Sequence, residues 1–275
     1  MFATSSRWGG RRVGRVPIDI ESADDPRVAE YVGLRNRAER SDVFIAESKL
    51  VVSRAVTSAY EVRSFLLAPD RYEQLRELVD QVDAPVYLAS RELMEQIVGY
   101  NVHRGVLASV LRGPSSTLPE VLQGAHRVLV LEGSNDLENI GAAARSARAL
   151  GYDALVVSPT CADPFSRRSV RVSMGEMLFL PVHRCTTWPG PLAELAQAGF
   201  ETWALTPDAS ANSLFDMGMP DKVALVAGGE GPGLTAATLE AAQFHVRIPM
   251  HRGVDSLNLA HALAIAMAAT SPPVD

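Results

Sequence analysis

The sequence predicts an α/β protein of two units, a smaller N-terminal unit followed by a larger unit built on a mostly parallel sheet. The chain has 275 residues, which is long enough for two modest domains. Strand-like apolar runs alternate with helix-like segments along both halves. A segment rich in Gly, Pro and Ser at residues 113–117 separates the halves.

The N-terminal unit is expected over residues 17–112. Residues 43–46, 62–67, 85–88 and 106–111 are predicted as strands because they are short and apolar, and residues 48–59, 70–79 and 90–98 as helices. A linker is expected over residues 113–123.

The C-terminal unit is expected over residues 124–275. Strands are predicted at residues 128–131, 154–157, 202–205, 223–227 and 246–248, with helices between them. One helix should begin near Asn139 and a last, almost wholly apolar one should cover residues 256–269. Such alternation implies a parallel sheet covered on both faces.

Composition is that of an ordinary globular protein, with 47% hydrophobic and 21% charged residues. No apolar run approaches the roughly 18 residues that span a bilayer, and the start of the chain lacks the apolar stretch of a secretory signal, so we expect a cytoplasmic protein without membrane contact. Cys161 and Cys185 lack metal-ligand spacing and are expected as buried free thiols.

The net charge of −6 alone argues against a nucleic-acid partner, but the arginines are clustered. Clusters of this kind can contact phosphate locally. The first 16 residues carry four arginines without an acid, and we expect them to form a basic tail that is disordered in the free protein. The clusters are Arg7, Arg11, Arg12 and Arg15; Arg35, Arg37 and Arg40; and Arg167, Arg168 and Arg171.

Three ordered stretches of the C-terminal unit resemble the motifs of one family. The first runs from Asn139 through Arg145 to Gly151, and the second is the apolar run and glycine loop at residues 224–234. The third pairs residues 248–250 (Ile-Pro-Met) with residues 256–258 (Ser-Leu-Asn). Together they resemble the SpoU (TrmH-type) family of RNA ribose 2′-O-methyltransferases, and several motifs in order seldom coincide by chance.

The resemblance implies a SPOUT domain with a trefoil knot, preceded by an L30e-like RNA-binding domain. Nothing in the periodicity indicates a knot, and general topology rules argue against one. The resemblance also implies S-adenosylmethionine as cofactor, RNA as substrate, and a homodimer formed through the last helix and the helix of the first motif. No metal is needed.

The glycine loop at residues 228–233 lacks the lysine of a phosphate-binding loop and does not follow the dinucleotide fingerprint. Alone it would more often mark a tight turn than a cofactor site. In the resembling family, this loop and the third motif hold the adenine side of the cofactor through backbone groups. The residues implied are Leu205, Thr206, Gly228, Gly229, Ile248, Met250 and Leu257.

The catalytic residues that the resemblance implies are Arg145, Asn139, Glu230, Ser256 and Asn258. Both asparagines also stand where helix caps are expected, and Glu230 could be structural or position a ribose. In the family the arginine is essential and has been proposed as the base. Because a guanidinium titrates above about 12 and only donates hydrogen bonds, positioning phosphate and stabilising oxyanion charge suit it better.

His261 departs from the family, which has small or branched apolar residues at this point. Two rival functions stay open: a non-catalytic RNA-binding protein of the same fold, which retention of the motif residues disfavours, and a dinucleotide-dependent enzyme, which the missing fingerprint disfavours. An L30e-like domain favours ribosomal RNA over transfer RNA as the substrate, with a transfer RNA 2′-O-methyltransferase as the alternative.

Overall fold

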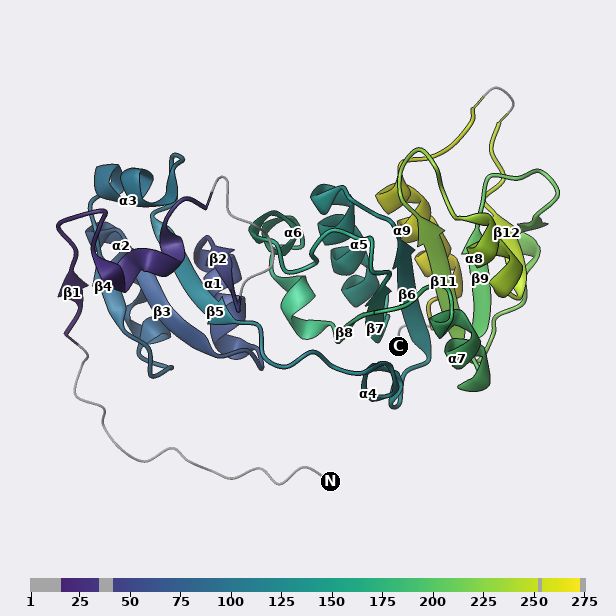
Figure 1. The fold of residues 1–275 in the computed structure, drawn as a ribbon, viewed down its shortest axis with the longest axis horizontal. Coiled ribbons are helices and arrows are strands. Elements are labelled where there is room, and N and C mark those ends of the chain that lie inside the picture. Colours follow the sequence, from purple (N-terminus) through teal and green to yellow (C-terminus); the bar gives the residue numbers. More distant parts are fainter. Residues whose placement is uncertain (1–15, 35–41, 252–253, 273–275) are drawn as a thin grey trace.

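The computed structural model describes residues 16–34, 42–251 and 254–272. Over these residues the chain forms two units arranged end to end along the long axis of the molecule, as Figure 1 shows. Each unit is a sheet with helices on both faces. The basic tail expected at residues 1–16 lies outside the described residues except for Val16, and so does the cluster of Arg35, Arg37 and Arg40.

The N-terminal unit contains a five-stranded mixed sheet in the order β1-β4-β3-β5-β2. The strands are β1 (Ile18–Asp19), β2 (Val43–Glu47), β3 (Val62–Leu67), β4 (Val86–Leu88) and β5 (Val106–Leu111). One face packs on α1 (Lys49–Thr57) and α2 (Pro69–Val79), and the other on the 3-10 helix η1 (Pro26–Tyr31) and α3 (Arg91–Val98).

The C-terminal unit contains a seven-stranded sheet in the order β10-β12-β9-β11-β6-β7-β8, and every pair in it is parallel. Parallel strands buried on both faces need continuous apolar sequence, and β6, β7 and β11 provide it. The strands are β6 (Arg127–Glu132), β7 (Ala154–Val157), β8 (Val182–Arg184), β9 (Glu201–Leu205), β10 (Asn212–Ser213), β11 (Val223–Gly228) and β12 (Phe244–Arg247).

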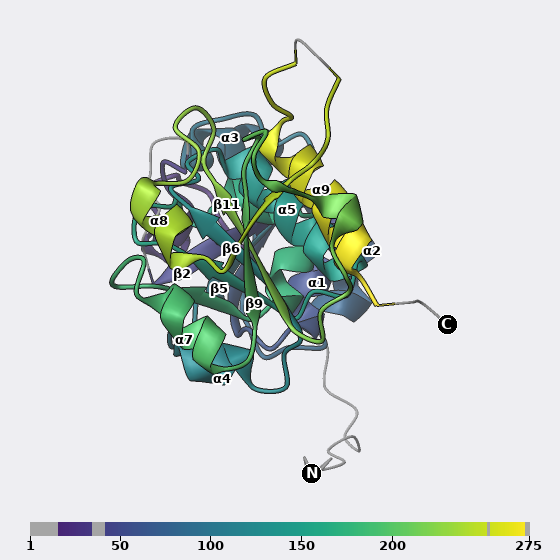
Figure 2. The same ribbon diagram turned by 90° about the vertical axis from the view of Figure 1, so that its right-hand side faces the viewer.

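Helices cover both faces of this sheet, as the end-on view in Figure 2 shows. On one face, α5 (Leu137–Ala149) and α9 (Leu259–Thr270) lie side by side, with η3 (Leu214–Asp216) at the end of α9. On the other face, α4 (Leu118–Leu122) and α7 (Pro191–Gln197) pack on the sheet, and α8 (Ala236–Ala241) packs on α7.

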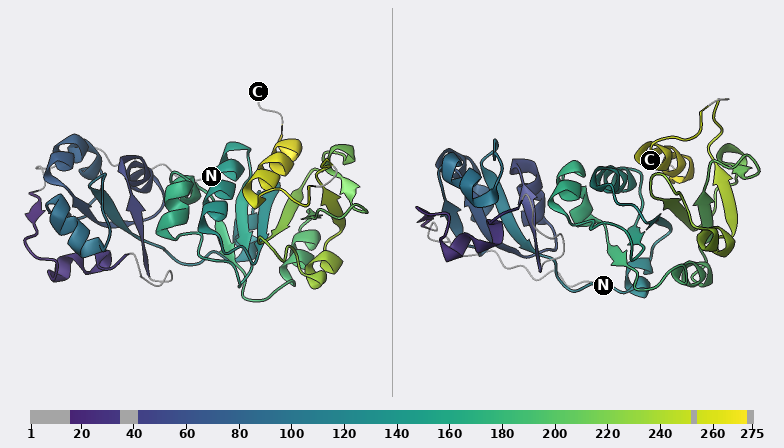
Figure 3. Two further views of the ribbon diagram at one scale, coloured as in Figure 1. Left: turned by 90° about the horizontal axis from the view of Figure 1, so that it is seen from above. Right: turned by 45° about the horizontal axis from the view of Figure 1, so that its top comes forward.

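The two units meet at α6 (Arg167–Val172) and the 3-10 helix η2 (Glu176–Phe179). Phe165, Val170 and Leu178 of the C-terminal unit pack into the hydrophobic core of the N-terminal unit. The ring of Phe165 lies 5.5 Å from those of both Phe44 and Tyr60. Viewed from above, α6, α5 and α9 follow one another along the long axis (Figure 3). Because α6 contacts both α5 and β2, it packs against both units.

The predicted order of helices and strands is confirmed, and the differences are local. The expected linker contains α4, which packs on the C-terminal unit, so a much shorter segment joins the two units. The last helix begins at Leu259 rather than Ser256, and β12 ends before Ile248. The short edge strands β1, β8 and β10 were not predicted. The trefoil knot and the L30e likeness stay predictions.

Candidate functional site

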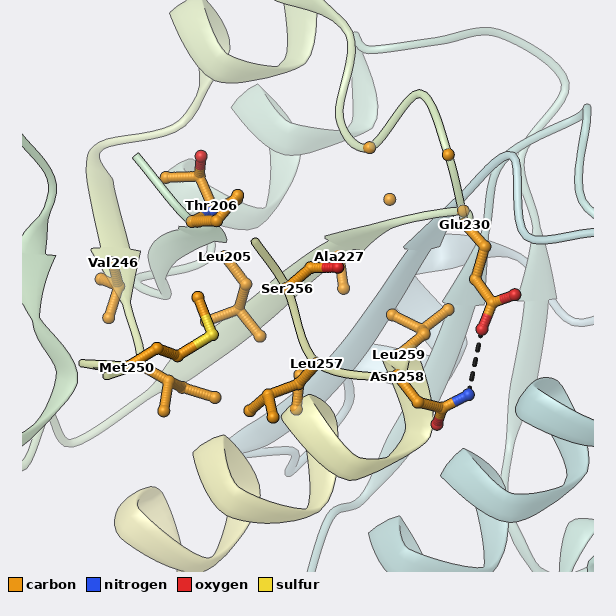
Figure 4. Close-up of a pocket in the computed structure, with 17 residues that line it drawn as sticks. Leu205, Thr206, Ala227, Glu230, Val246, Met250, Ser256, Leu257, Asn258 and Leu259 are labelled. Atoms are coloured by element: carbon orange, nitrogen blue, oxygen red, sulfur yellow. Dashed lines mark hydrogen bonds between the residues drawn. The ribbon is translucent and has the colours of Figure 1, made fainter. Parts of the chain in front are cut away.

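The main candidate site is a pocket of about 440 Å³ at the carboxyl ends of β9, β11 and β12. Parallel strands end at one edge of a sheet, which brings the loops that follow them together. The start of α9 borders the pocket, as Figure 4 shows. Its lining is mostly aliphatic, with a few polar groups: Leu205, Thr206, Pro207, Ala227, Gly228, Gly229, Glu230, Gly231, Gly233, Val246, Ile248, Met250, Ser256, Leu257, Asn258, Leu259 and Ala262.

All seven residues expected at the cofactor line this pocket, together with Glu230, Ser256 and Asn258. Segments more than 50 residues apart in the sequence therefore converge, as the motifs predicted. The prediction did not name the other lining residues, although their closeness to the predicted ones is a signal that could have found them: Pro207, Ala227, Gly231, Gly233, Val246, Leu259 and Ala262.

The glycine loop folds tightly back on itself beside the pocket. A Cβ atom on Gly228 would lie 2.1 Å from the carbonyl carbon of Gly233, and one on Gly229 would lie 2.4 Å from the carbonyl oxygen of Gly133. Both contacts are to backbone, which cannot swing away. Gly231 and Gly233 have φ angles of 91° and 68°, in the left-handed region that favours glycine. The glycines are thus required by the loop itself, whatever the pocket binds.

Glu132 holds both ends of the glycine loop from the end of β6. Its backbone carbonyl accepts a hydrogen bond from Gly229 N at 2.8 Å. Its buried carboxylate accepts from Thr235 N at 3.0 Å and Thr235 Oγ1 at 2.8 Å, just after the loop. The indole of Trp188 donates to the same carboxylate at 2.8 Å. In the sequence, Glu132 follows an apolar run and has no feature of the motifs.

Asn139, Glu230 and Asn258 form a hydrogen-bonded cluster at one side of the pocket. Asn139 Nδ2 donates to Glu230 Oε1 at 2.8 Å, and Asn258 Nδ2 donates to the same oxygen at 3.0 Å. Asn258 Nδ2 also lies 3.0 Å from Oδ1 of Asn139. Figure 4 shows the Glu230–Asn258 bond. Over the described residues, Glu230 Oε2 has no hydrogen-bond partner, so it can accept one from a ligand.

The two asparagines differ in their capping roles. Asn258 caps α9 as expected, since its Oδ1 accepts from the backbone N–H groups of Ala260 and His261. Asn139 is not a cap, because α5 begins two residues earlier and Asp136 is its N-cap. Asn139 is buried within the first turn and has its side chain free to bind Glu230. The capping interpretation of Asn139 was wrong.

Arg145 lies apart from this cluster. It is exposed on α5, does not line the pocket, and makes no hydrogen bond or ion pair with the part of the chain that the structure describes. Six residues along a helix place Asn139 and Arg145 on different faces of α5. Its own chain therefore does not bring Arg145 to the pocket.

The two cysteines are buried free thiols, as expected. Burial raises the pKa of the Cys185 thiol to about 11, which keeps it neutral near pH 7. Among the described residues no group of three His, Cys, Asp or Glu side chains could hold a metal ion. No helix in the described ranges has the length and apolarity to cross a bilayer.

Comparison with known proteins gives the family. The model of the SpoU rRNA Methylase family matches residues 126–268. The chain belongs to this family. It is 41% identical, over 90% of its length and 89% of the other, to an uncharacterized tRNA/rRNA methyltransferase of Mycobacterium tuberculosis.

Two further relatives have more specific names. RlmP of Bacillus subtilis, a 23S rRNA guanosine 2′-O-methyltransferase, is 27% identical over 90% of this chain and 96% of its own. The structure of the SpoU methyltransferase AviRb from Streptomyces viridochromogenes, in complex with AdoMet, superposes with a TM-score of 0.77 and 25% identity, over 90% of this chain and 97% of that one. The likeness covers both units.

We predict that Glu132→Ala loosens the glycine loop without unfolding the protein. A buried carboxylate that serves a backbone N–H, a hydroxyl and an indole contributes about 1–3 kcal/mol, so amide hydrogen exchange at residues 229–235 should accelerate about ten- to a hundredfold. Glu201→Ala is the control, because it removes a similar carboxylate–indole bond, to Trp203, away from the loop. Unchanged exchange in Glu132→Ala would contradict the anchoring role.

Proposed function

We propose that this protein transfers a methyl group from S-adenosylmethionine to a ribose 2′-hydroxyl of structured ribosomal RNA. The observation that carries the proposal is the pocket in which the second and third motifs meet, with the Asn139–Glu230–Asn258 cluster at one side. Membership of the SpoU rRNA methylase family and the likeness to RlmP support ribosomal RNA and the 2′-oxygen. Such a substrate implies a cytoplasmic protein.

The pocket fits the proposed cofactor in size and chemistry. A volume of about 440 Å³ lies in the range of about 300–1,000 Å³ that is typical of small-molecule sites. Leu205, Ile248, Met250 and Leu257 offer apolar contact to an adenine ring, and the backbone of the glycine loop approaches without side chains. When bound, the cofactor supplies an electrophilic methyl group, which is bonded to a positively charged sulfur.

Glu230 is assigned to the ribose. The two asparagine amides fix its Oε1, which leaves Oε2 to accept a hydrogen bond from a ribose hydroxyl. That bond would orient the 2′-oxygen and raise its electron density, and Oε2 offers an acceptor for the proton that is released when the O–CH3 bond forms and the S–CH3 bond breaks. Ser256 lines the same pocket and offers a second hydroxyl contact.

Arg145 is assigned to the RNA phosphate and to the developing charge on the 2′-oxygen. Its five N–H groups are donors, and electrostatic stabilisation of this type is a major source of catalysis. Because Arg145 does not line the pocket of its own chain, bound RNA or a second copy of the chain must bring the two together.

Two measurements test the proposed function. Isothermal titration should detect binding of S-adenosylmethionine and no binding of NAD. Binding of NAD would instead support a dinucleotide-dependent enzyme. Mass spectrometry of nucleosides from ribosomal and transfer RNA, incubated with protein and cofactor, should detect a new 2′-O-methyl nucleoside in the ribosomal fraction. Cofactor binding without methylation of either RNA would favour the non-catalytic RNA-binding protein, and methylation of the transfer RNA alone would favour that substrate.

We predict that Arg145→Ala leaves cofactor affinity within about twofold of wild type and removes most methyl transfer. Losing charge stabilisation at the reacting oxygen should lower the single-turnover rate by about a hundredfold or more. Arg76→Ala, at an exposed arginine on α2 of the N-terminal unit, serves as the control. A single-turnover rate within twofold of wild type would rule out this assignment.

We also propose a homodimer formed through α9 and α5. Ile265 and Leu257 are 37% and 38% exposed on an apolar helix and its start, a surface that a partner would cover. We predict that Ile265→Asp shifts sedimentation equilibrium from dimer to monomer at micromolar concentration, because it buries an unpaired charge in the contact. Val32→Asp, at an exposed valine of the N-terminal unit, should stay dimeric. A monomeric wild type contradicts the dimer.

A further inference from the structure

We propose that six arginines on α1, α5 and α6 form a phosphate-binding surface, which guides the RNA from the N-terminal unit to the Asn139–Glu230–Asn258 cluster. This inference rests on the proposed function and adds the route of the substrate. Figure 1 shows α1, α6 and α5 in this order along the middle of the molecule. The basic band, as we call this surface, consists of Arg54, Arg145, Arg148, Arg167, Arg168 and Arg171.

Ion pairs show that the band is continuous across the junction. On the N-terminal side, Arg167 and Arg171 of α6 both reach Glu47 at the end of β2, the second with a separation of 3.9 Å. The guanidinium group of Arg167 also lies 4.2 Å from the ring centre of Tyr100. These contacts tie α6 to the N-terminal unit.

Two further glutamates complete the band. Glu176 of η2 pairs with Arg54 of α1 at 2.5 Å and with Arg148 of α5 at 3.8 Å, so its carboxylate bridges arginines of the two helices. Glu138 at the start of α5 pairs with Arg168 of α6 at 2.5 Å. The three glutamates therefore link all three helices.

The band holds more positive charge than docking of the two units requires. Each glutamate already has one close arginine: Arg167 on Glu47, Arg168 on Glu138 and Arg54 on Glu176. Arg145, Arg148 and Arg171 are in excess. The ion pairs of Arg148 and Arg171 are long, at 3.8 and 3.9 Å, and their side chains are 40% and 50% exposed, so both side chains are accessible to a phosphate.

The band leads to the site because of how α5 and α6 pack. A Cβ on Gly141 would lie 2.6 Å from the carbonyl oxygen of Ser169, so the two helices are in close contact. Helical spacing puts Glu138, Arg145 and Arg148 on the same side of α5 as Gly141, next to α6. Glu138 is followed by Asn139, whose amide holds Glu230. Phosphates on the band would thus pass beside the residues assigned to the ribose.

Because the protein has a net charge of −6, its overall field repels a polyanion such as RNA. A local excess of arginine offsets this repulsion at the surface where RNA binds. Guanidinium groups bind phosphate well because their N–H donors match its oxygens. An acidic protein or a second copy of the chain could use the same charges, and the experiment below separates these cases.

The test is the double substitution Arg148→Gln with Arg171→Gln. Binding of in vitro transcribed 23S rRNA is measured at several salt concentrations, alongside titration with S-adenosylmethionine to verify that the variant is folded. We expect about tenfold weaker RNA binding, a log–log salt slope smaller by about 1.5, and unchanged cofactor affinity, since each lost phosphate contact removes about 0.7–0.9 from the slope. Lys222→Gln is the control, because Lys222 lies before β11 at the opposite edge of the sheet from the pocket.

An RNA affinity and salt slope equal to those of wild type would overturn the basic band. So would a variant that loses only self-association in sedimentation, which would mark a contact between copies. Failure of the proposed function would look different: the wild type itself would not bind S-adenosylmethionine or would not methylate RNA, whatever the variant does.

Discussion

The site depends on one carboxylate oxygen shared between two amides. Glu230 Oε1 accepts hydrogen bonds from both Asn139 and Asn258, so a single atom connects the start of α5, the glycine loop and the start of α9. These three segments are far apart in the sequence, and the shared oxygen holds their side chains together beside the pocket. Because an ionised acceptor gives stronger hydrogen bonds than a neutral one, the cluster keeps one face of Glu230 fixed and the other available.

The ends of the sheet strands and the loops after them form the rest of the pocket. Glycines at residues 228 and 229 let the loop fold back onto its own backbone and onto Gly133, and Glu132 holds the far end of the loop through Thr235. The backbone that faces the pocket is thus positioned by contacts behind it. Selection of a ligand by main-chain groups needs such support, because a loose loop would lose its hydrogen-bond geometry.

Much of this could be predicted from the sequence. The apolar runs gave the strands of the parallel sheet, because strands buried on both faces cannot alternate with polar residues. The motif residues predicted the pocket lining, from Leu205 to Leu257. Edge strands as short as β10, with two residues, carry too little pattern to be recognised. Glu132 looks like a solvated acid in the sequence, since its partners are 50 or more residues away. The rival interpretation of Asn139 as a helix cap fails because Asp136, three residues earlier, has the same capping preference and takes that position.

The arginines show a different limit of sequence reasoning. From the sequence, the arginine cluster at residues 167–171 can contact phosphate, yet in the fold Arg167 and Arg168 pair with Glu47 and Glu138, which lie 120 and 30 residues away. Only the folded chain shows which charges are used to dock the two units and which are in excess. Since Val170 and Leu178 are buried in the core of the N-terminal unit and the partly buried Phe165 packs against it, the docking is apolar as well as ionic. An RNA held by both units must therefore fit a fixed distance between them, and the relative placement of the units becomes part of substrate recognition.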